Sequence, residues 1–479
     1  MKIAMVATEC TPFFKTGGLA DVIGSLPKAL THLDHELTVF LPKTASLPSI
    51  VLEQLEWVET FDVAVKWRNQ HCAVLRYKEH QVTYYFIEND YYFDRIPFYG
   101  QADDGERFAF FTHAVLDTIN RLNFTIDIVH CHDWQTGLIP AYIKTGALES
   151  QPKIIYTIHN LRYQGVFPHS VFDDLLHLNE QHRLGLEHNE NINFMKAAIY
   201  HADWITTVSP TYSEEIQTPA FGEGLDRLLC ERKHSLSGIV NGIDEEYYNP
   251  SKDFNIPYTY HRQPEKKQEN KKALQDKLGL TISENTPMIA LISRLVDEKG
   301  VSLLVDTADE LLREEDVQLV LLGSGDAHLE EQLERMARTH PERVSFYKGF
   351  NEKLAAFMYA AADFLLMPSK FEPCGLSQLI ALRYETVPIV RETGGLKDTI
   401  SSFNEFNGEG NGLSFTNYNE RDFLYTVRRG LWLYRVEHLW NQLLQNIYQS
   451  SSNWVHSAKA YENVYNHVMT KGAWDQRDE

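Results

Sequence analysis

The sequence predicts an α/β protein made of two doubly wound parallel sheets that face each other across a cleft, and three observations support this fold class. The chain has 479 residues, more than one hydrophobic core usually organises, so we expect two domains of roughly 200 to 250 residues. Short β-rich apolar runs alternate with amphipathic stretches in both halves, which is typical of a parallel sheet covered by helices. This rhythm pauses over residues 245–270, which are polar and contain prolines. We therefore expect domains over 1–245 and 246–453, followed by a terminal segment over 454–479.

The first half begins with a strand-like run and continues with a helix and further strands. KIAMVAT at residues 2–8 is short and apolar, GLADVIGSLPKALTHL at 18–33 has helical spacing, and ELTVFL at 36–41 reads as the next strand. DIVHCHDW, KIIYTIHN and WITTVSP follow in turn. Because a loop or helix-like stretch separates these runs, they are predicted to be successive strands of one sheet.

The second half repeats the same alternation. Its strand-like runs are PMIALIS, VQLVLLG, VSFYKG, FLLMPS and VPIVRE, and NEKLAAFMYAAAD and GLSQLIALRYE are helix-like stretches between them. A second doubly wound sheet is therefore expected. Ligands of such sheets bind outside the carboxyl ends of the strands, so the loops that follow these runs are where functional residues are expected.

Charge and cysteine content limit the possible partners and compartments. The formal net charge is −21, which argues against nucleic acid or an anionic membrane as a partner, because both require a basic surface. No apolar stretch of 18 residues occurs. The five cysteines are far apart and form no C-x-x-C motif, so neither a disulfide framework nor a zinc site is indicated. We expect a protein of the reducing cytoplasm.

Two similar glycine-rich turns follow the first strand of the first half and the last strand-like run of the second. KTGGLADVIG at 15–24 and TGGLKDTI at 393–400 share the pattern Thr-Gly-Gly-Leu-x-Asp. Glycine permits close backbone approach, and the amides at a helix start attract phosphate. Both turns are expected to contact one anionic ligand. The alternative is that they are helix starts that bind no ligand.

A local group of cations is needed if an acidic protein is to bind an anion. SRLVDEKG places Arg294 and Lys299 just after a strand of the second half, where a diphosphate is expected to lie. Lys15 precedes the first glycine-rich turn. Solvated surface is the alternative for such loop charges.

Other phosphate- and metal-binding motifs do not occur in the sequence. There is no G-x-x-x-x-G-K-[ST] motif, and GSGDAH at residue 323 lacks the third glycine of the dinucleotide fingerprint. The chain also contains no Asp-x-Asp pair. We therefore expect cationic side chains in place of a metal ion.

The motif FEPCGLSQL follows a strand and opens a helix. The amides of Gly375 and Leu376 can face a phosphate or ribose, and Glu372 can accept hydrogen bonds from sugar hydroxyls. Glu372 as a simple helix cap is the alternative. Cys374 has no evident base beside it, so we expect a small buried side chain and no covalent chemistry.

Two neighbouring strands of the first half end in polar residues. His130 and His132 lie on one face of a strand, which would suit a metal, but no third ligand is evident. Asp133 and His159 are interpreted as groups at a sheet edge that contact a sugar, with helix capping as the alternative for Asp133. Asn241, in NGID, closes the first half and would contribute at the hinge.

Taken in order, these motifs resemble those of the bacterial glycogen synthases of glycosyltransferase family 5. The resemblance runs from KTGGLADV through HDWQTGL, TIHNLRYQG, SRLVDEKG, SKFEPCGLSQL and RETGGLKDT to NWVHSAKAYENVY. It implies the GT-B architecture, with two Rossmann-like domains and a C-terminal helix over 454–479 that crosses back to the first domain. It also implies transfer of glucose from ADP-glucose to the non-reducing end of an α-1,4-glucan, with retention of anomeric configuration.

The resemblance implies roles for particular residues, with no cofactor and no metal. Lys15, Gly17 and Gly18 would meet the donor's phosphates from the first domain, and Arg294 and Lys299 from the second, where they would stabilise the leaving ADP. The remaining residues implied in the site are Glu372, Asp133, His159 and Asn241 on the sugar side, Asp21 in the glycine-rich segment, Phe350 on the adenine, and Cys374, Gly375, Leu376, Thr393, Gly394 and Gly395 near the donor.

The sequence departs from the usual family pattern at three positions, Lys370, Glu298 and Lys397, which bear on nucleobase preference. The competing interpretations are another GT-B transferase that uses a UDP-sugar, a glucan phosphorylase with pyridoxal phosphate, and a non-catalytic glucan- or nucleotide-binding protein. The expected partners are a nucleotide sugar and an α-glucan, with no nucleic acid and no membrane. Nothing in the sequence indicates an oligomeric state.

Overall fold

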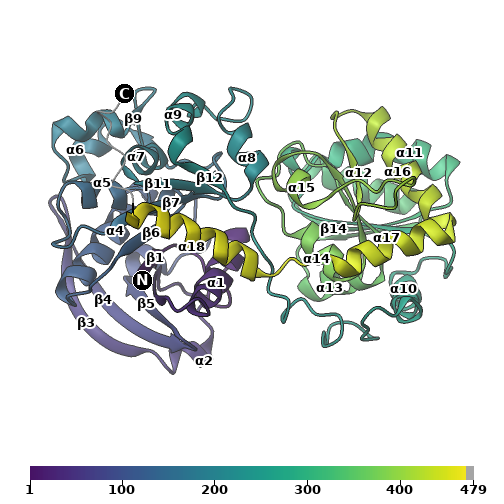
Figure 1. Cartoon of the computed structure of the whole chain (residues 1–479), viewed down its shortest axis with the longest axis horizontal. Coiled ribbons are helices and arrows are strands. Elements are labelled where there is room, and N and C mark those ends of the chain that lie inside the picture. The colour runs from purple at the N-terminus through teal and green to yellow at the C-terminus, as the bar shows by residue number, and fades with distance from the viewer. Residues whose placement is uncertain (471–479) are drawn as a thin grey trace. The chain divides into compact units, whose positions relative to one another are not determined.

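The computed structural model of the chain describes residues 1–470 and divides into two compact units (Figure 1). The first unit comprises Met1–Ile239 together with the segment that begins at Trp454, and the second comprises Val240–Asn453. The division at Ile239 lies slightly before the expected boundary at residue 245. Asn241 therefore belongs to the second unit, and not to the first as expected.

A nine-stranded sheet forms the centre of the first unit. Its strands lie in the order β12-β11-β7-β6-β1-β2-β5-β4-β3. The strands from β12 to β5 pair in parallel, whereas β4 pairs antiparallel with both β5 and β3. The bounds are β1 (Lys2–Val6), β2 (Glu36–Pro42), β3 (Glu56–Val65), β4 (Arg68–Glu79), β5 (Val82–Glu88), β6 (Ile128–His132), β7 (Lys153–Ile158), β11 (Trp204–Thr207) and β12 (Leu236–Gly238).

Helices and one small sheet complete the first unit. The antiparallel sheet β8-β10-β9 comprises Val166–Pro168, Asn191–Asn193 and Glu187–His188. The helices are α1 (Gly18–Thr31), α2 (Ser49–Leu52), α3 (Asp90–Phe93), α4 (Asp104–Arg121), α5 (Ile139–Lys144), α6 (Val171–Leu175), α7 (Phe194–His201), α8 (Pro210–Glu215) and α9 (Asp226–Glu231).

The last described helix, α18 (Trp454–Thr470), packs in the first unit although the second unit precedes it in the chain. It lies beside α1 (Figure 1), and its buried Trp454, Tyr461 and Tyr465 join one hydrophobic cluster with side chains of α1 and of strands β1 and β2. Residues 471–479 of the expected terminal helix lie outside the described residues. The packing explains the apolar stripe of α18, which contains the buried Trp454, Tyr461 and Tyr465.

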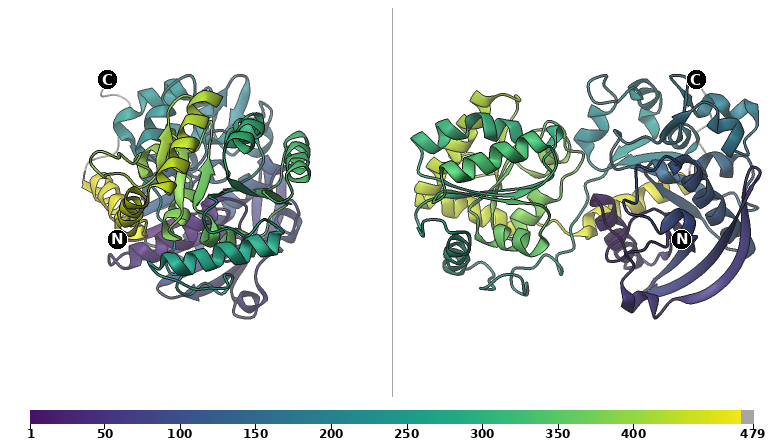
Figure 2. Two further views of the ribbon diagram at one scale, coloured as in Figure 1. Left: turned by 90° about the vertical axis from the view of Figure 1, so that its right-hand side faces the viewer. Right: turned by 180° about the vertical axis from the view of Figure 1, so that it is seen from behind.

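The second unit contains a six-stranded, fully parallel sheet in the order β15-β14-β13-β16-β17-β18. Helices cover both of its faces (Figure 2). The strands are β13 (Met288–Ile292), β14 (Gln318–Gly323), β15 (Val344–Lys348), β16 (Phe364–Met367), β17 (Val387–Arg391) and β18 (Leu413–Phe415). The helices are α10 (Pro264–Leu278), α11 (Val301–Glu314), α12 (Ala327–Thr339), α13 (Glu352–Ala361), α14 (Ser377–Arg383), α15 (Gly394–Thr399), α16 (Glu420–Arg435) and α17 (Glu437–Gln449).

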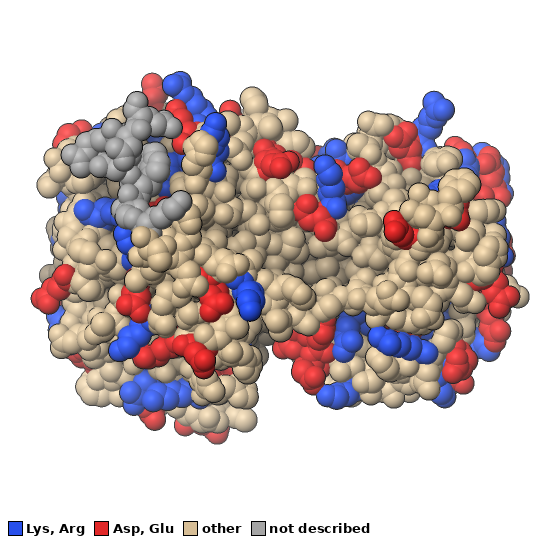
Figure 3. Space-filling model, in the orientation of Figure 1, with Lys and Arg blue, Asp and Glu red and all other residues tan. Residues whose placement is uncertain are grey.

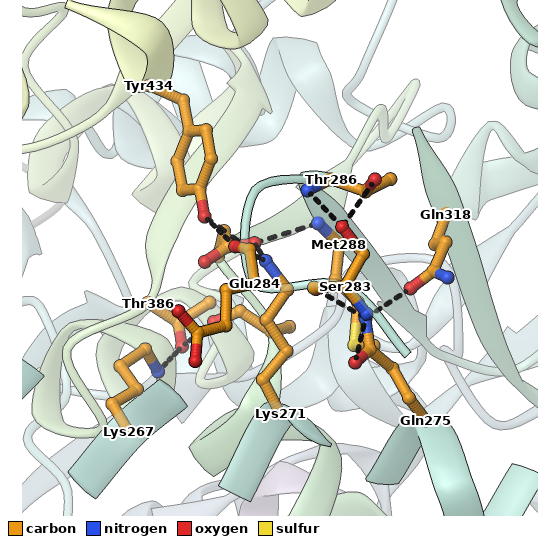
Figure 4. Close-up of polar contacts among 12 residues, drawn as sticks. Lys267, Lys271, Gln275, Ser283, Glu284, Thr286, Met288, Gln318, Thr386 and Tyr434 are labelled. Atoms are coloured by element: carbon orange, nitrogen blue, oxygen red, sulfur yellow. Dashed lines mark hydrogen bonds and ion pairs between the residues drawn. The ribbon is translucent and has the colours of Figure 1, made fainter. Parts of the chain in front are cut away.

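Helix α10 packs against this unit through polar side chains (Figure 4). Lys267 Nζ donates to the carbonyls of Tyr359, Ala360 and Tyr384 and to Thr386 Oγ1. Lys271 Nζ forms an ion pair with Asp363 Oδ2 at 2.7 Å, and both side chains are buried. Burial of these cations is tolerated because hydrogen-bond acceptors surround each of them.

Acidic and basic side chains are interspersed on the face drawn in Figure 3. Among residues 1–470, no helix has the length and apolar character needed to cross a membrane.

Candidate functional site

The loops at the carboxyl edges of the two sheets carry the residues that the sequence singled out. In the first unit, Lys15 follows β1 and Asp133 and His159 follow β6 and β7, which pair as parallel neighbours. In the second unit, Arg294, Glu372 and the TGGL turn follow β13, β16 and β17, which also pair in parallel. Parallel pairing places these loops at one edge within each unit.

An acidic side chain occupies the first glycine-rich turn. Glu9 accepts hydrogen bonds from the Thr16 amide (2.6 Å), the Thr16 hydroxyl (2.6 Å) and the Gly17 amide (3.0 Å). The Tyr99 hydroxyl donates a fourth bond to the same carboxylate at 2.9 Å. This arrangement differs from the expectation that the Gly17 amide faces a phosphate, because that amide already has an anionic partner. Gly18 opens α1, so the first-turn amides of this helix are the donors that remain.

Lys15 lies beside this turn and is held by a residue of α1. Its Nζ contacts Asp21 Oδ1 at 2.7 Å, and the lysine side chain is 42% exposed. An exposed pair of this kind contributes little to stability. Its effect is to hold the ammonium group near the start of α1, where an anion is also favoured by the helix dipole.

Asp133 has an unusual backbone and does not cap the following helix. Its φ and ψ are 57° and 177°, a region that residues other than glycine rarely adopt. Its Oδ1 accepts the amide of His159 at 2.8 Å, so the side chain joins the ends of β6 and β7. Burial raises the pKa of the Asp133 carboxyl to about 7, the amides of His159 and Asn160 oppose the rise, and nearby Glu9 adds to it. The capping alternative is therefore wrong, and Asp133 combines a strained backbone with a carboxyl of raised pKa at this edge.

His159 is paired with another histidine. Its Nε2 lies 3.0 Å from Nδ1 of His132, the last residue of β6. Burial lowers the pKa of His159 to about 3, so the imidazole is neutral near pH 7. A neutral imidazole can donate through one nitrogen and accept through the other, which suits recognition of a hydroxyl group.

In the second unit, the cations of SRLVDEKG occupy different surroundings. Arg294 is exposed, and its guanidinium makes no hydrogen bond or ion pair with residues 1–470. Lys299 Nζ lies 2.5 Å from Glu372 Oε2, and Ser369 donates to the same oxygen from 3.1 Å. Because α14 has no side-chain N-cap, the capping alternative for Glu372 is wrong. The structure brings Lys299 and Glu372 together as one charge pair.

The FEPCGL and TGGL segments pack backbone against backbone. The Gly395 amide donates to the carbonyls of Glu372 (3.2 Å) and Pro373 (3.0 Å). A Cβ atom at Gly394 would lie 2.0 Å from the Glu372 carbonyl oxygen, and Gly394 has a φ of +44°. Glycine is therefore required in this turn for close contact between two loops. These glycines therefore have a packing role, and their contact with a ligand stays a prediction.

The remaining predicted residues of the second unit differ in exposure. Burial raises the pKa of the Cys374 thiol to about 12, and the polar groups of Asn241 oppose this rise. A thiol of that pKa is no nucleophile near neutral pH. Gly375 and Leu376 immediately precede α14, and Phe350 is 85% exposed in the loop between β15 and α13.

Sequence reasoning missed Glu9, Tyr99 and the pairing of His132 with His159. Glu9 carries a charge three residues after a buried strand, which was a usable signal, whereas Tyr99 is distant in the sequence and gave none. His130 and His132 do lie with their rings 4.1 Å apart. Among the described residues, no group of three or more His, Cys, Asp or Glu side chains is arranged to hold a metal ion.

Comparisons with known proteins cover the same two units. The family model described as "Starch synthase catalytic domain" matches residues 2–231, and that described as "Glycosyl transferases group 1" matches residues 274–431. The glycogen synthase of Halalkalibacterium halodurans is 53% identical, over 98% of this chain and 99% of that protein. The chain belongs to the glycogen synthase family. The glycogen synthase of Oceanobacillus iheyensis is 47% identical, over 97% of this chain and 97% of that protein.

A solved structure extends the family match to three dimensions. The catalytic domain of starch synthase IV from Arabidopsis thaliana, bound to ADP and acarbose, aligns with a TM-score of 0.90 and 30% identity over 98% of this chain and 99% of that one. A sucrose-phosphate synthase from Thermosynechococcus elongatus aligns over the same shares with a TM-score of 0.63 and 16% identity, a likeness of fold alone. As a member of the glycogen synthase family, the chain is a glycosyltransferase with the GT-B fold, as the motifs predicted.

Proposed function

We propose that the chain transfers glucose from ADP-glucose to the non-reducing end of an α-1,4-glucan, with retention of anomeric configuration. The observation that carries this proposal is the full-length similarity to a starch synthase that was solved with ADP and acarbose. ADP corresponds to the leaving group of this donor, and acarbose resembles a short glucan. Family membership alone leaves the nucleotide of the donor open.

The leaving ADP requires positive charge as its bond to glucose breaks. We assign this role to Arg294 and Lys299, which the loop after β13 carries. An exposed arginine with no described partner is available for a bidentate contact to phosphate. Lys299 is oriented by its 2.5 Å contact with Glu372. Preorganised cations of this kind stabilise charge that develops in the transition state, and we propose that they act without a metal ion.

Glu372, Asn241, Asp133 and His159 are assigned to the sugar. Glu372 has one oxygen engaged by Lys299 and Ser369, which leaves the other as an acceptor for a sugar hydroxyl. The partly protonated Asp133 and the neutral His159 both offer hydrogen-bonding groups without a full charge. This suits recognition of an uncharged hexose.

On the first unit, Lys15 and Gly18 are assigned to the phosphates, and Asp21 orients Lys15. We place Gly17 outside this set, because its amide donates to Glu9. On the second unit, the exposed Phe350 is assigned to the adenine. We assign to the donor-contacting surface of this unit the segments that carry Thr393, Gly394, Gly395, Cys374, Gly375 and Leu376.

The cysteines and the proposed substrate support a cytoplasmic location. All five cysteines are unpaired, which is typical of a reducing environment. We propose a cytoplasmic enzyme whose partners are a nucleotide sugar and an α-glucan.

A donor competition tests the proposed function. Purified protein is incubated with glycogen and equal concentrations of ADP-glucose and UDP-glucose, and released ADP and UDP are quantified. The proposal predicts ADP release matched by glucose incorporation. Preferential UDP release would overturn the donor assignment, and no release of either would favour a non-catalytic binding protein. Release of glucose 1-phosphate from glycogen and inorganic phosphate would instead indicate a phosphorylase.

A further inference from the structure

A buried histidine lies directly behind His159. His132 ends β6, is fully buried, and places its Nδ1 3.0 Å from His159 Nε2. The two rings are 5.3 Å apart with an interplanar angle of 36°. His159 itself is half-buried, and its backbone amide is fixed by Asp133 at 2.8 Å. His159 is therefore held at two points, one on its backbone and one on its ring.

The other nitrogen of His132 has no hydrogen-bond partner among residues 1–470. The nearest ring is that of His130, 4.1 Å away, and both nitrogens of His130 are already engaged. Its Nε2 lies 2.6 Å from Thr157 Oγ1, and its Nδ1 lies 2.9 Å from the Tyr465 hydroxyl. The Nε2 atom of His132 thus lies in a buried environment that offers it no polar contact.

The unpaired Nε2 atom of His132 indicates which ring donates the hydrogen bond between His132 and His159. Burial lowers the pKa of His132 well below its usual value, so both rings are neutral and each carries one N–H. If His159 donated to His132, the proton of His132 would sit on the buried Nε2 with no acceptor. If His132 donates to His159, only a bare nitrogen is left unpaired. Buried N–H groups without acceptors are rarer in proteins than underused acceptors, which favours the second arrangement.

We propose that His132 is a positioning residue that donates Nδ1–H to His159 Nε2 and so fixes His159 as its Nδ1–H tautomer. His159 then presents an N–H donor at its half-buried edge, where a sugar hydroxyl oxygen can accept it. The inference rests on the proposed function only for the identity of that acceptor. The tautomer itself is a property of the free protein.

Nitrogen NMR of the free protein tests the tautomer without any turnover. Protein labelled with ¹⁵N-histidine is compared with the His159→Gln variant to assign the His159 signals. The proposal predicts a protonated, pyrrole-like Nδ1 and an unprotonated Nε2 in His159. A protonated Nε2 in the wild-type protein would overturn it. This outcome is independent of whether the protein transfers glucose.

Variants of His132 test its control over His159. His132→Ala is expected to abolish the fixed tautomer, whereas His132→Asn, which retains a donor near the position of Nδ1, is expected to keep it. The matched control is His201→Ala, which removes a half-buried histidine of the first unit whose Nδ1 lies 2.8 Å from the Ala197 carbonyl oxygen. A His159 spectrum that is unchanged in His132→Ala would overturn the proposal.

Deoxy analogues of the donor test whether the His159 tautomer contributes to recognition of a sugar hydroxyl. In the wild-type protein, removal of the hydroxyl that accepts from His159 is expected to lower kcat/KM about tenfold or more, as loss of one hydrogen bond does. In His132→Ala that penalty should shrink for this one hydroxyl and persist for the others, with His132→Asn close to wild type. Equal penalties in the wild type and His132→Ala would contradict the positioning role.

Discussion

Arg294 shows how a single exposed side chain can matter for chemistry and hardly at all for stability. Its guanidinium makes no hydrogen bond or ion pair with residues 1–470, so Arg294→Ala should leave the thermal unfolding temperature within error of the wild type. If it stabilises the leaving diphosphate, kcat/KM with ADP-glucose should fall by about 100-fold to 1,000-fold. Steady-state kinetics and thermal unfolding measure the two effects.

The control for this substitution is Arg335→Ala, because Arg335 is also exposed and lies on α12 of the same unit. It should leave both quantities unchanged. A folded Arg294→Ala protein with wild-type kcat/KM would remove Arg294 from the mechanism.

Asp133 makes stability depend on pH in a direction opposite to that of a typical salt-bridged carboxylate. Burial raises its pKa to about 7 in the folded protein, above the roughly 3.9 of an unfolded chain. The folded state therefore binds more protons between these values, and stability contributed by the protonated carboxyl is lost as pH rises from about 4 to about 7. Between pH 5 and pH 8 the free energy of unfolding of the wild-type protein should fall. In Asp133→Asn this fall should be smaller than in the wild type by roughly 1 to 3 kcal/mol.

Urea unfolding of both proteins at several pH values measures this difference. Identical pH profiles would show that Asp133 ionises normally in the folded state.

The ability of the sequence to identify site residues depended on how local each signal was. Lys299 and Glu372 were predicted because each follows a recognisable strand, and the structure brings them to 2.5 Å. Tyr99 reaches Glu9 from a distance of 90 residues along the chain, and no local pattern predicts such a contact. The helix-capping alternatives for Asp133 and Glu372 were reasonable by position, but both side chains bond neighbouring loops instead.

At the level of elements, the turn between β1 and α1 depends on one internal carboxylate. Glu9 accepts two amides and two hydroxyl groups. In Glu9→Gln a single oxygen must serve these donors while an NH₂ group faces them, so we expect the turn to open more often. Hydrogen exchange at the amides of Thr16 and Gly17 should accelerate about tenfold or more.

Glu36→Gln, an exposed change at the start of β2, is the control and should leave exchange at this turn unaltered. Unchanged protection of Thr16 and Gly17 in Glu9→Gln would show that the turn holds its shape without the carboxylate.

Helix α10 depends on a buried ion pair. Lys271→Met would leave Asp363 without its cation inside the protein, and removal of one partner of a buried pair costs about 3 to 5 kcal/mol. The double variant Lys271→Met/Asp363→Asn should recover much of this loss, because the Asp363 position then carries no charge. Urea unfolding provides the measurement.

Lys272 offers the matched control, since it is the next residue of α10 but pairs with Glu284 at the surface. Lys272→Met should cost less than about 1 kcal/mol. Equal losses for the two lysines would contradict the proposed importance of burial.

The two glycine-rich turns show where sequence similarity exceeded structural equivalence. Both follow a strand and open a helix, as predicted. A Cβ at Gly17 would meet nothing within 4 Å, whereas one at the equivalent Gly394 would lie 2.0 Å from the Glu372 carbonyl oxygen. The first turn is open and held by a carboxylate, and the second is packed against another loop. Identical letters cannot distinguish these cases, because the distinction lies in the neighbouring chain.

For the whole molecule, strand rhythm was enough to predict two parallel α/β units. The antiparallel pairing of β3 and β4 was not predicted, because no strand was predicted between the runs at 36–41 and 127–134. The two-residue connections at 66–67 and 80–81 are long enough only for antiparallel hairpins. The packing of α18 in the first unit was predicted from the family resemblance, and the pattern of its own residues did not indicate it. Buried, long-range contacts such as that of Tyr465 with His130 are what fix its place.

We propose that this chain is a glucosyltransferase in which Arg294 and Lys299 supply the charge that a metal ion supplies in other enzymes. The most direct test is the initial rate of glucose incorporation into glycogen from ADP-glucose, measured with excess EDTA and then with added Mg²⁺ or Mn²⁺. We predict the full rate in EDTA and no more than a small change on adding metal. A rate that collapses in EDTA and returns with the metal would contradict the claim.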